Sequence, residues 1–351
     1  MTTPALLRPA DALDGFALPA ELEATRPPET RGLRRDQVRL MVSDREGIRH
    51  RRFDDLPSEL RAEDLVVVNT SATLPASVVV SPELAIHFST VLPGGLHIVE
   101  MRELAGASSL PYRHPGPGRV VLPGGGLVEI LSPFPVGSAS RRLWSAQVEL
   151  GRPLPDYLDT WGRPIRYRHT DSPYPLSAHQ TVFARFPGSA EMPSAGRPFT
   201  VGLVTSLVAS GVSIAPLTLH TGVSSLEIGE TPYPEWFEIP ETTAARVNET
   251  RAGGGRVIAV GTTVVRALET TADSRGRAHP GRAWTDLVIG PNHRPSVVDG
   301  LITGWHEPES THLGLLQALA GRDILVESYQ AALDTGYLCH EFGDSHLILP
   351  G

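Results

Sequence analysis

Residues 253–271, GGGRVIAVGTTVVRALETT, decide the fold that we expect for this chain. Three glycines allow a turn, and the apolar run at residues 256–260 is typical of a strand covered on both faces. Gly261 turns the chain, and Thr262 or Thr263 can cap the helix that follows. A helix that begins just past a strand directs free N–H groups at the strand's carboxyl end, where a carboxylate, phosphate or sugar hydroxyl can bind. The same pattern also fits a plain strand–turn–helix joint without a ligand.

Helices and strands alternate on both sides of this unit. Residues 39–43 and 48–53 resemble a hairpin, and residues 65–69 resemble a buried strand. After residue 151 the apolar spacing predicts further elements: helices at 199–210, 241–251, 311–320 and 323–334, and strands at 213–220, 286–289, 299–305 and within 337–349. Such alternation predicts a layered α/β core domain with a largely parallel sheet.

The stretch from residue 75 to residue 151 has a different texture. Short apolar runs are separated there by Gly, Pro and Ser turns, with no helical pattern between them. Regular short strands of this kind predict a small β-barrel or sandwich. We therefore expect an α/β core made of residues 1–74 and 152–351, interrupted by an inserted small β-barrel domain at residues 75–151.

The composition limits the cellular setting and the partners. The chain has 351 residues, a net charge of −8 and a single cysteine, Cys339, so no intrachain disulfide can form. No apolar run approaches the roughly 20 residues that span a bilayer, and no signal peptide is recognisable. We expect a cytoplasmic protein that does not associate with membranes. The acidic balance argues against broad, non-specific binding of nucleic acid, although it allows a local basic patch.

Polar side chains follow several predicted strands at the edge where open α/β sheets bind ligands. His220 and His306 can move protons near neutral pH, although a histidine at a strand end is often only structural. Arg266 and Glu269 lie three apart on one predicted helix and are expected to pair. The spacing of His306 and His312 matches no standard metal site, so we expect no metal. The remaining candidates for substrate binding are Asn69, Thr221, Gly222, Gly261, Thr262, Thr263, Arg266, Thr303 and Asp344.

Six stretches in the same order resemble the S-adenosylmethionine:tRNA ribosyltransferase-isomerase family of queuosine biosynthesis. They are GGGRVIAVGTTVVRALET, RLMVSDREGIRHRRFDDLP (39–57), DLVVVNTSATLPASV (64–78), LTLHTG (217–222), VDGLITGWHEPEST (298–311) and GDSHLIL (343–349). The resemblance implies an α/β core with an inserted β-barrel. It also implies a reaction in which the ribosyl part of S-adenosylmethionine moves onto the aminomethyl group of a 7-deazaguanine base in tRNA, becomes an epoxycyclopentanediol, and releases adenine and methionine.

This reaction requires three tasks of the active site. A base has to remove a proton beside the sulfonium, the sugar has to be held, and adenine has to be protonated as it leaves. S-adenosylmethionine is a co-substrate, and no metal or redox cofactor is required. The resemblance assigns these tasks to His220, His306 and the polar turn at residues 261–263.

Several motif positions depart from the family pattern. The histidine of TAGLHFT is Pro198, and a second histidine expected before Glu235 is Tyr233 or Pro234. The motif YRFFSYGDAM reads YLCHEFGDSH at residues 337–346. Basic residues of the family motifs are replaced at Ala72, Ser77, Leu338 and Glu309. Each lost phosphate contact weakens tRNA binding by about 1 kcal/mol, so we expect tRNA as a partner, bound more weakly.

Two alternatives to an active tRNA-modifying enzyme follow from these departures. The chain could be a paralogue that uses S-adenosylmethionine or a related nucleoside on an acceptor other than tRNA. It could also be a non-catalytic binding protein on the same scaffold, although the retained His220, His306 and residues 261–263 argue against this. No feature of the sequence points to a particular oligomeric state.

Overall fold

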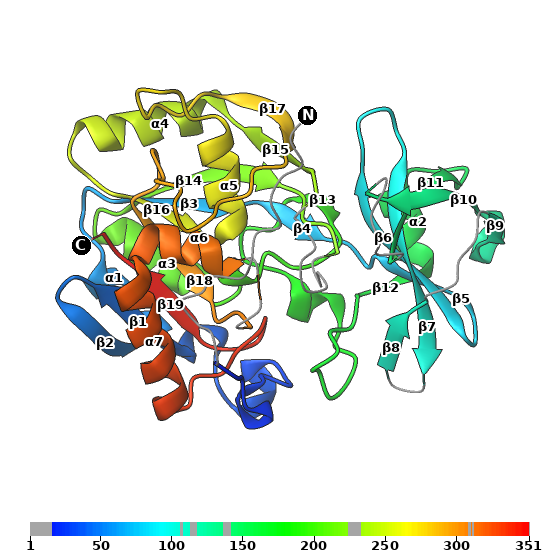
Figure 1. Ribbon diagram of the computed structural model, residues 1–351, viewed down its shortest axis with the longest axis horizontal. Helices are drawn as coiled ribbons and strands as arrows, with labels where there is room; N and C mark the ends of the chain where they lie inside the picture. The colour runs from blue at the N-terminus through cyan, green and yellow to red at the C-terminus, as the bar shows by residue number, and fades with distance from the viewer. Residues whose placement is uncertain are drawn as a thin grey trace.

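The computed structural model describes residues 16–105, 108–112, 118–135, 142–223, 233–307, 310 and 312–350. Figure 1 shows two lobes side by side along the long axis, one mixed α/β and one smaller and mainly β. No helix in this part of the chain is long and apolar enough to cross a membrane.

The larger lobe is built on one mixed sheet. Its central neighbours β14, β3, β16 and β18 are parallel, and the remaining contacts are antiparallel except for the parallel pair β1 and β19. In the described part of the chain the strand order is β17 (Gly281–Thr285), β15 (Glu235–Ile239), β14 (Ser213–Leu219), β3 (Leu65–Asn69), β16 (Val257–Val260), β18 (Gly300–Gly304), β19 (Ser345–Ile348), β1 (Arg39–Asp44) and β2 (Gly47–Arg52).

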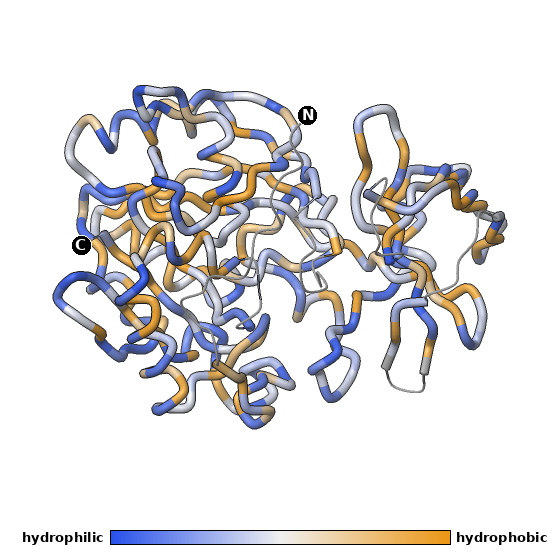
Figure 2. Tube along the Cα trace, viewed as in Figure 1, coloured by the Kyte–Doolittle hydropathy of each residue, from blue (hydrophilic) through white to orange (hydrophobic). Residues whose placement is uncertain are grey.

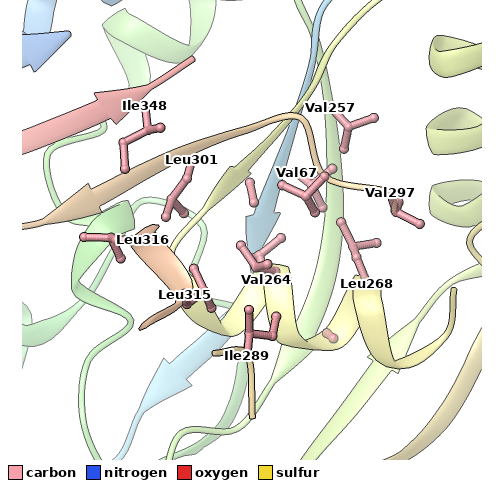
Figure 3. Close-up of a cluster of buried hydrophobic side chains, with 14 of the residues drawn as sticks. Val67, Val257, Val264, Leu268, Ile289, Val297, Leu301, Leu315, Leu316 and Ile348 are labelled. Atoms are coloured by element: carbon pink, nitrogen blue, oxygen red, sulfur yellow. The ribbon is translucent and has the colours of Figure 1, made fainter. Parts of the chain in front are cut away.

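Helices cover both faces of this sheet, so the structure confirms the layered α/β prediction for this lobe. On one face Val264, Leu268 and Leu316 pack with strand residues such as Val67 and Leu301 (Figure 3). On the other face helix residues such as Leu203 pack with Val66 and Ile258. The helices are α1 (Leu56–Glu59), α3 (Val201–Ala209), α4 (Glu241–Ala252), α5 (Thr262–Thr270), α6 (His312–Ala320) and α7 (Arg322–Thr335).

The strands at the centre of the sheet are buried on both faces, which explains their continuous apolar sequences. Every residue of β3 and of β16 is buried. Figure 2 shows hydrophobic stretches gathered at this centre, whereas the surrounding loops are mainly hydrophilic. The predicted hairpin is also confirmed, because β1 and β2 pair antiparallel along their whole length and the turn lies between Asp44 and Gly47.

The smaller lobe is a second, antiparallel sheet. Among the described residues its ladder is open, with β12 and β9 at its two ends, so a closed barrel is not confirmed. The sheet continues past residue 151, because β12 pairs with β5. Its strands are β12 (Gly162–Arg163), β5 (Ser77–Ser81), β6 (Leu84–Val91), β7 (His97–Ala105), β11 (Leu143–Glu149), β10 (Leu127–Phe134) and β9 (Gly118–Val121), with β8 (Ser108–Pro111) beside β7 and helix α2 (Leu154–Trp161) packed against it.

Two expectations about local structure are wrong. Residues 286–289 are not a strand; the strand β17 ends at Thr285, and Arg266 binds the carbonyl oxygens of Thr285 and Leu287. These two carbonyl oxygens therefore accept hydrogen bonds from the Arg266 side chain and not from a neighbouring strand. Neither Thr262 nor Thr263 caps helix α5, because the residue at the N-cap position is Gly261 and no side chain bonds there.

His346 lies on β19, between β18 and β1 of the main sheet, and gives a testable pH dependence. Its ring is 0% exposed, lies 2.7 Å from the Ser43 hydroxyl and stacks on Trp305. Burial lowers the pKa of His346 to about 3. An unfolded histidine has a pKa near 6.5, so acidification from about pH 6 to pH 4 protonates the unfolded state first and destabilises the fold.

We expect His346→Met to reduce this acid sensitivity. The free energy of unfolding of the unmodified chain contains a contribution from His346 that falls by about 1.4 kcal/mol per pH unit in that range. Urea unfolding at several pH values measures this slope. An identical slope in the variant would show that His346 does not resist protonation in the folded state.

Candidate active site

The carboxyl ends of the parallel strands meet a cavity of about 190 Å³ beside the start of helix α5. Gly261 joins β16 to α5 with φ of 94°, in the left-handed region that favours glycine. The N–H of Gly261 donates to the carbonyl oxygen of Ile302 over 2.8 Å, which ties this turn to β18. Gly261, Thr262 and Thr263 then line the cavity, so the first turn of the helix lies at its wall.

Seven of the predicted site residues line this one cavity. They come from the ends of β14, β16 and β18 and from helix α5. These three strands are distant in the sequence but belong to the run β14, β3, β16, β18 of neighbouring strands in the sheet. These residues are Thr221, Gly261, Thr262, Thr263, Arg266, Thr303 and His306.

Two histidines stand together in the cavity wall. The rings of His306 and His312 stack with centroids 4.6 Å apart, and His306 Nε2 lies 2.9 Å from the Thr303 hydroxyl oxygen. Burial, followed by the neighbouring His312 and His340, holds the pKa of His306 well below its usual value. Burial and the charge of Arg266 lower the pKa of His312 to about 4. Both imidazoles are therefore unprotonated near pH 7, which is the form that a general base requires.

An arginine–glutamate pair forms another part of the wall. Arg266 Nη1 donates to Glu235 Oε2, and the N–H of Gly222 donates to Glu235 Oε1 over 3.1 Å. The expected pairing of Arg266 with Glu269 is wrong, because Glu269 instead accepts hydrogen bonds from Ser296, Val297 and Val298. Gly222 thus contributes to the site through Glu235, without lining the cavity itself in the described structure.

The remaining predicted residues lie outside the cavity lining. Asn69 bonds the backbone of Leu219 through both its amide nitrogen and its carbonyl oxygen, which joins β3 to β14. Asp344 accepts hydrogen bonds from the N–H groups of Arg39 and Leu338. These two side chains are used to hold neighbouring segments together.

His220 does not line the cavity either, because its ring is packed against neighbouring side chains. Its Nδ1 lies 2.7 Å from the Ser71 hydroxyl oxygen, and its ring stacks on Trp236 with centroids 4.9 Å apart. A Cβ atom added at Gly188 would lie 2.4 Å from the ring, so the packing is tight. Burial lowers the pKa of His220 to about 4. In this conformation His220 is a packed residue beside the site.

The cavity also contains residues that were not predicted as site residues from the sequence. Glu191 and Met192 precede α3, Tyr233 precedes β15, and Glu341 follows the turn after α7. Glu191 belongs to the stretch EMPSAG, but its distance along the sequence from His306 gave no sign that the two residues line one cavity. Glu309 and residues 224–226, which differ from the family pattern, lie outside the described residues.

Comparison with known proteins gives a consistent result along nearly the whole chain. A family model described as "Queuosine biosynthesis protein" matches residues 14–348. A protein from Symbiobacterium thermophilum named S-adenosylmethionine:tRNA ribosyltransferase-isomerase is 36% identical over 95% of this chain and 98% of its own length. A protein of the same name from Natranaerobius thermophilus is 34% identical over 95% of this chain and 97% of its own length.

A solved structure extends the comparison to the fold. The crystal structure of S-adenosylmethionine tRNA ribosyltransferase from Thermotoga maritima is 28% identical, covers 95% of this chain and 99% of its own, and gives a TM-score of 0.53. Sequence and structure comparisons thus agree over almost all of the chain. The chain belongs to the queuosine biosynthesis protein family.

Proposed function

We propose that this chain is an S-adenosylmethionine:tRNA ribosyltransferase-isomerase. The observation that carries the proposal is the identity of 36% over nearly the full length to a protein of that name. The reaction moves the ribosyl group of S-adenosylmethionine onto 7-aminomethyl-7-deazaguanine in tRNA, and it forms epoxyqueuosine, adenine and methionine. S-adenosylmethionine is consumed as a co-substrate, and the reaction as written needs no further cofactor.

We assign the cavity at the start of α5 to S-adenosylmethionine. Its wall combines the first turn of a helix with the paired charges of Arg266 and Glu235, so it offers donors and acceptors to a polar nucleoside. His306 is the base in this proposal, because it lines the cavity and its imidazole is neutral near pH 7. Thr303 positions the His306 ring through the contact between its hydroxyl oxygen and Nε2.

A second cavity, of about 450 Å³, is our candidate for tRNA phosphates. It lies where β5 and β12 meet the segment after α2, and Arg102, Arg163, Arg166 and Arg168 line it. Ser77, which replaces an arginine of the family motif, lines the same cavity. Arginines from other segments therefore supply positive charge where this motif arginine is lost, which supports binding of an RNA backbone.

Reversing two of these charges is expected to weaken tRNA binding. Arg163 and Arg168 are exposed, and neither makes a salt bridge with another described residue. In the double variant Arg163→Glu and Arg168→Glu, we expect the slope of log K against log salt to fall by about 2, because about 1 unit is lost with each phosphate contact. Filter binding of tRNA at several salt concentrations measures this slope.

The matched control keeps the same change in net charge. Arg275 and Arg282 are exposed and do not line the arginine cavity, so the double variant Arg275→Glu and Arg282→Glu reverses two charges elsewhere. Equal losses of affinity in the two double variants would mean that only the net charge matters, and the arginine cavity would lose its assignment.

The decisive test of the function is adenine release from S-adenosylmethionine. The purified chain is incubated with and without tRNA carrying the aminomethyl-deazaguanine base, and the tRNA is weighed by mass spectrometry. We expect adenine release together with the corresponding gain in tRNA mass. Binding of S-adenosylmethionine without release of adenine would instead favour an acceptor other than tRNA. The replacement of motif arginines by Ala72, Ser77 and Leu338 points to this alternative.

Two further features complete the proposal. We propose that the smaller sheet is a domain inserted into the α/β core; the pairing of β12 with β5 extends it beyond the boundary at residue 151 that the sequence suggested. We also propose a cytoplasmic location, which agrees with a tRNA substrate and with Cys339 as a free, buried thiol.

A further inference from the structure

We propose that His169, His340 and Glu341 form a binding site for one divalent transition-metal ion at the edge of the active-site cavity. One ligand atom of each residue lies within 4.8 Å of the other two. Two imidazoles and one carboxylate are a donor set that suits zinc and other first-row divalent ions. No motif of the sequence pointed to this site, because His169 is far from the other two residues along the chain.

One polar atom of each of the three residues is buried and lacks a hydrogen bond. Nε2 of His169, Nε2 of His340 and Oε2 of Glu341 have no hydrogen-bond partner in the described part of the structure. His169 Nε2 and Glu341 Oε2 lie 3.1 Å apart, but they are not aligned for a hydrogen bond. Buried polar atoms without partners are costly, and several that face one another are explained by an ion between them.

The separations are compatible with one ion. Metal–ligand distances of about 2.0–2.2 Å place the ligand atoms of a tetrahedral zinc about 3.3–3.6 Å apart. The His169–Glu341 pair is at 3.1 Å, and the three ligand atoms lie within 4.8 Å of one another. Because the rings of His169 and His340 are stacked, one of them has to turn about its side-chain bonds before both Nε2 atoms point at the ion. Two further carboxylates lie near His340 Nε2, that of Glu23 at 3.9 Å and that of Glu307 at 4.0 Å, and their negative charge favours a cation.

The backbone holds the His340–Glu341 pair in place. His340 has φ of 72°, a left-handed conformation that a non-glycine residue rarely adopts. Hydrogen bonds on both sides maintain it: Cys339 N–H donates to Leu22, His340 N–H donates to Trp305, and Gly343 N–H donates to His340. Strained backbone of this kind is concentrated at ligand sites, where the surrounding structure stabilises it.

Both residues of this pair depart from the family motif given above. The family motif reads Phe and Ser at the positions of His340 and Glu341. Two donors therefore appear together at the same turn, directly opposite His169, whose ring stacks on His340 with centroids 4.1 Å apart. Because Glu341 also lines the active-site cavity, an ion held here would fasten the loop around His169 to the cavity wall.

Metal titration of the purified full-length chain tests this proposal without reference to its enzymatic activity. After removal of metals by a chelator and dialysis, the chain is titrated with Zn²⁺ by calorimetry and with Co²⁺ by visible absorption. We expect one equivalent to bind, with a Co²⁺ spectrum typical of nitrogen and oxygen ligands. The melting temperature should rise with the concentration of Zn²⁺.

Variants separate this site from other histidines of the chain. The double variant His340→Phe and Glu341→Ser restores the residues of the family motif, and we expect it to bind Zn²⁺ at least about 100-fold more weakly. His279→Ala is the control, since His279 is exposed and pairs with Asp273 outside this cluster. His340→Asn checks the result if the double variant does not fold, as judged by circular dichroism.

The outcomes are distinct. Failure of the unmodified chain to bind one equivalent, or undiminished binding by folded variants of His340, would overturn the metal site. A chain that binds Zn²⁺ but does not release adenine would leave the metal site standing and contradict only the proposed enzymatic function.

Discussion

Replacement of His306 by alanine is expected to lower turnover about 10²-fold or more while leaving the fold intact. The expected loss is large because His306 is a neutral imidazole in the cavity wall, where it can take the proton beside the sulfonium. The fold should survive because the backbone N–H of His306, which lies 3.3 Å from the Tyr329 hydroxyl oxygen, is unchanged. Single-turnover adenine release and circular dichroism measure the two effects.

The pH profile adds a second test of the same assignment. A base has to be deprotonated to act, and the pKa of His306 is held well below 6.5 by burial. Deprotonation of His306 should therefore not limit turnover between pH 6 and pH 8. The control for the His306→Ala variant is His279→Ala, because His279 is exposed and does not line the cavity. Unchanged turnover in His306→Ala would remove His306 from the mechanism.

Replacement of Glu269 by alanine is expected to destabilise the fold by about 3–5 kcal/mol. Glu269 is 8% exposed, and its carboxylate accepts hydrogen bonds from the N–H groups of Ser296, Val297 and Val298 and from the Ser296 hydroxyl, at 2.9–3.0 Å. Alanine would leave these N–H groups without an acceptor in the interior. Urea unfolding measures the loss.

Two comparisons make the Glu269 prediction specific. Glu269→Gln keeps one acceptor oxygen, so its loss of stability should be intermediate. Glu249→Ala removes an exposed carboxylate from α4 and should change the free energy of unfolding by no more than about 0.5 kcal/mol. A loss in Glu269→Ala as small as that of the control would mean that the segment at residues 296–298 does not depend on this carboxylate.

The sequence predicted the parts of the site that depend on local pattern. The strand–turn–helix unit around Gly261 was recognisable because a buried strand and an amphipathic helix have different periods. Thr303, near the end of β18, and His306, just past that end, also fall at the expected edge of the sheet. The strand ends of a parallel sheet meet at one edge, so residues on different strands can be grouped from the sequence alone.

The parts that the sequence did not predict depend on contacts between distant segments. Arg266 was paired with Glu269 because they lie three apart, but the fold offers it Glu235 and two backbone carbonyl oxygens instead. His220 follows its strand as expected, yet Trp236 and Ser71 enclose its ring. Side-chain direction at a strand end and the choice between competing partners are tertiary properties, which residue spacing does not determine.

The position of β19 in the main sheet has a consequence for biosynthesis. This strand lies between β18 and β1, although it follows every other strand along the sequence. Roughly 300 residues separate it from β1, which corresponds to about 15–60 s of translation. During that time the β1–β2 hairpin lacks the neighbour that joins it to the other strands, and its free edge is open to incorrect pairing. The sheet is therefore completed only after nearly all of the chain has been synthesised, which makes the nascent protein a natural client for chaperones on the ribosome.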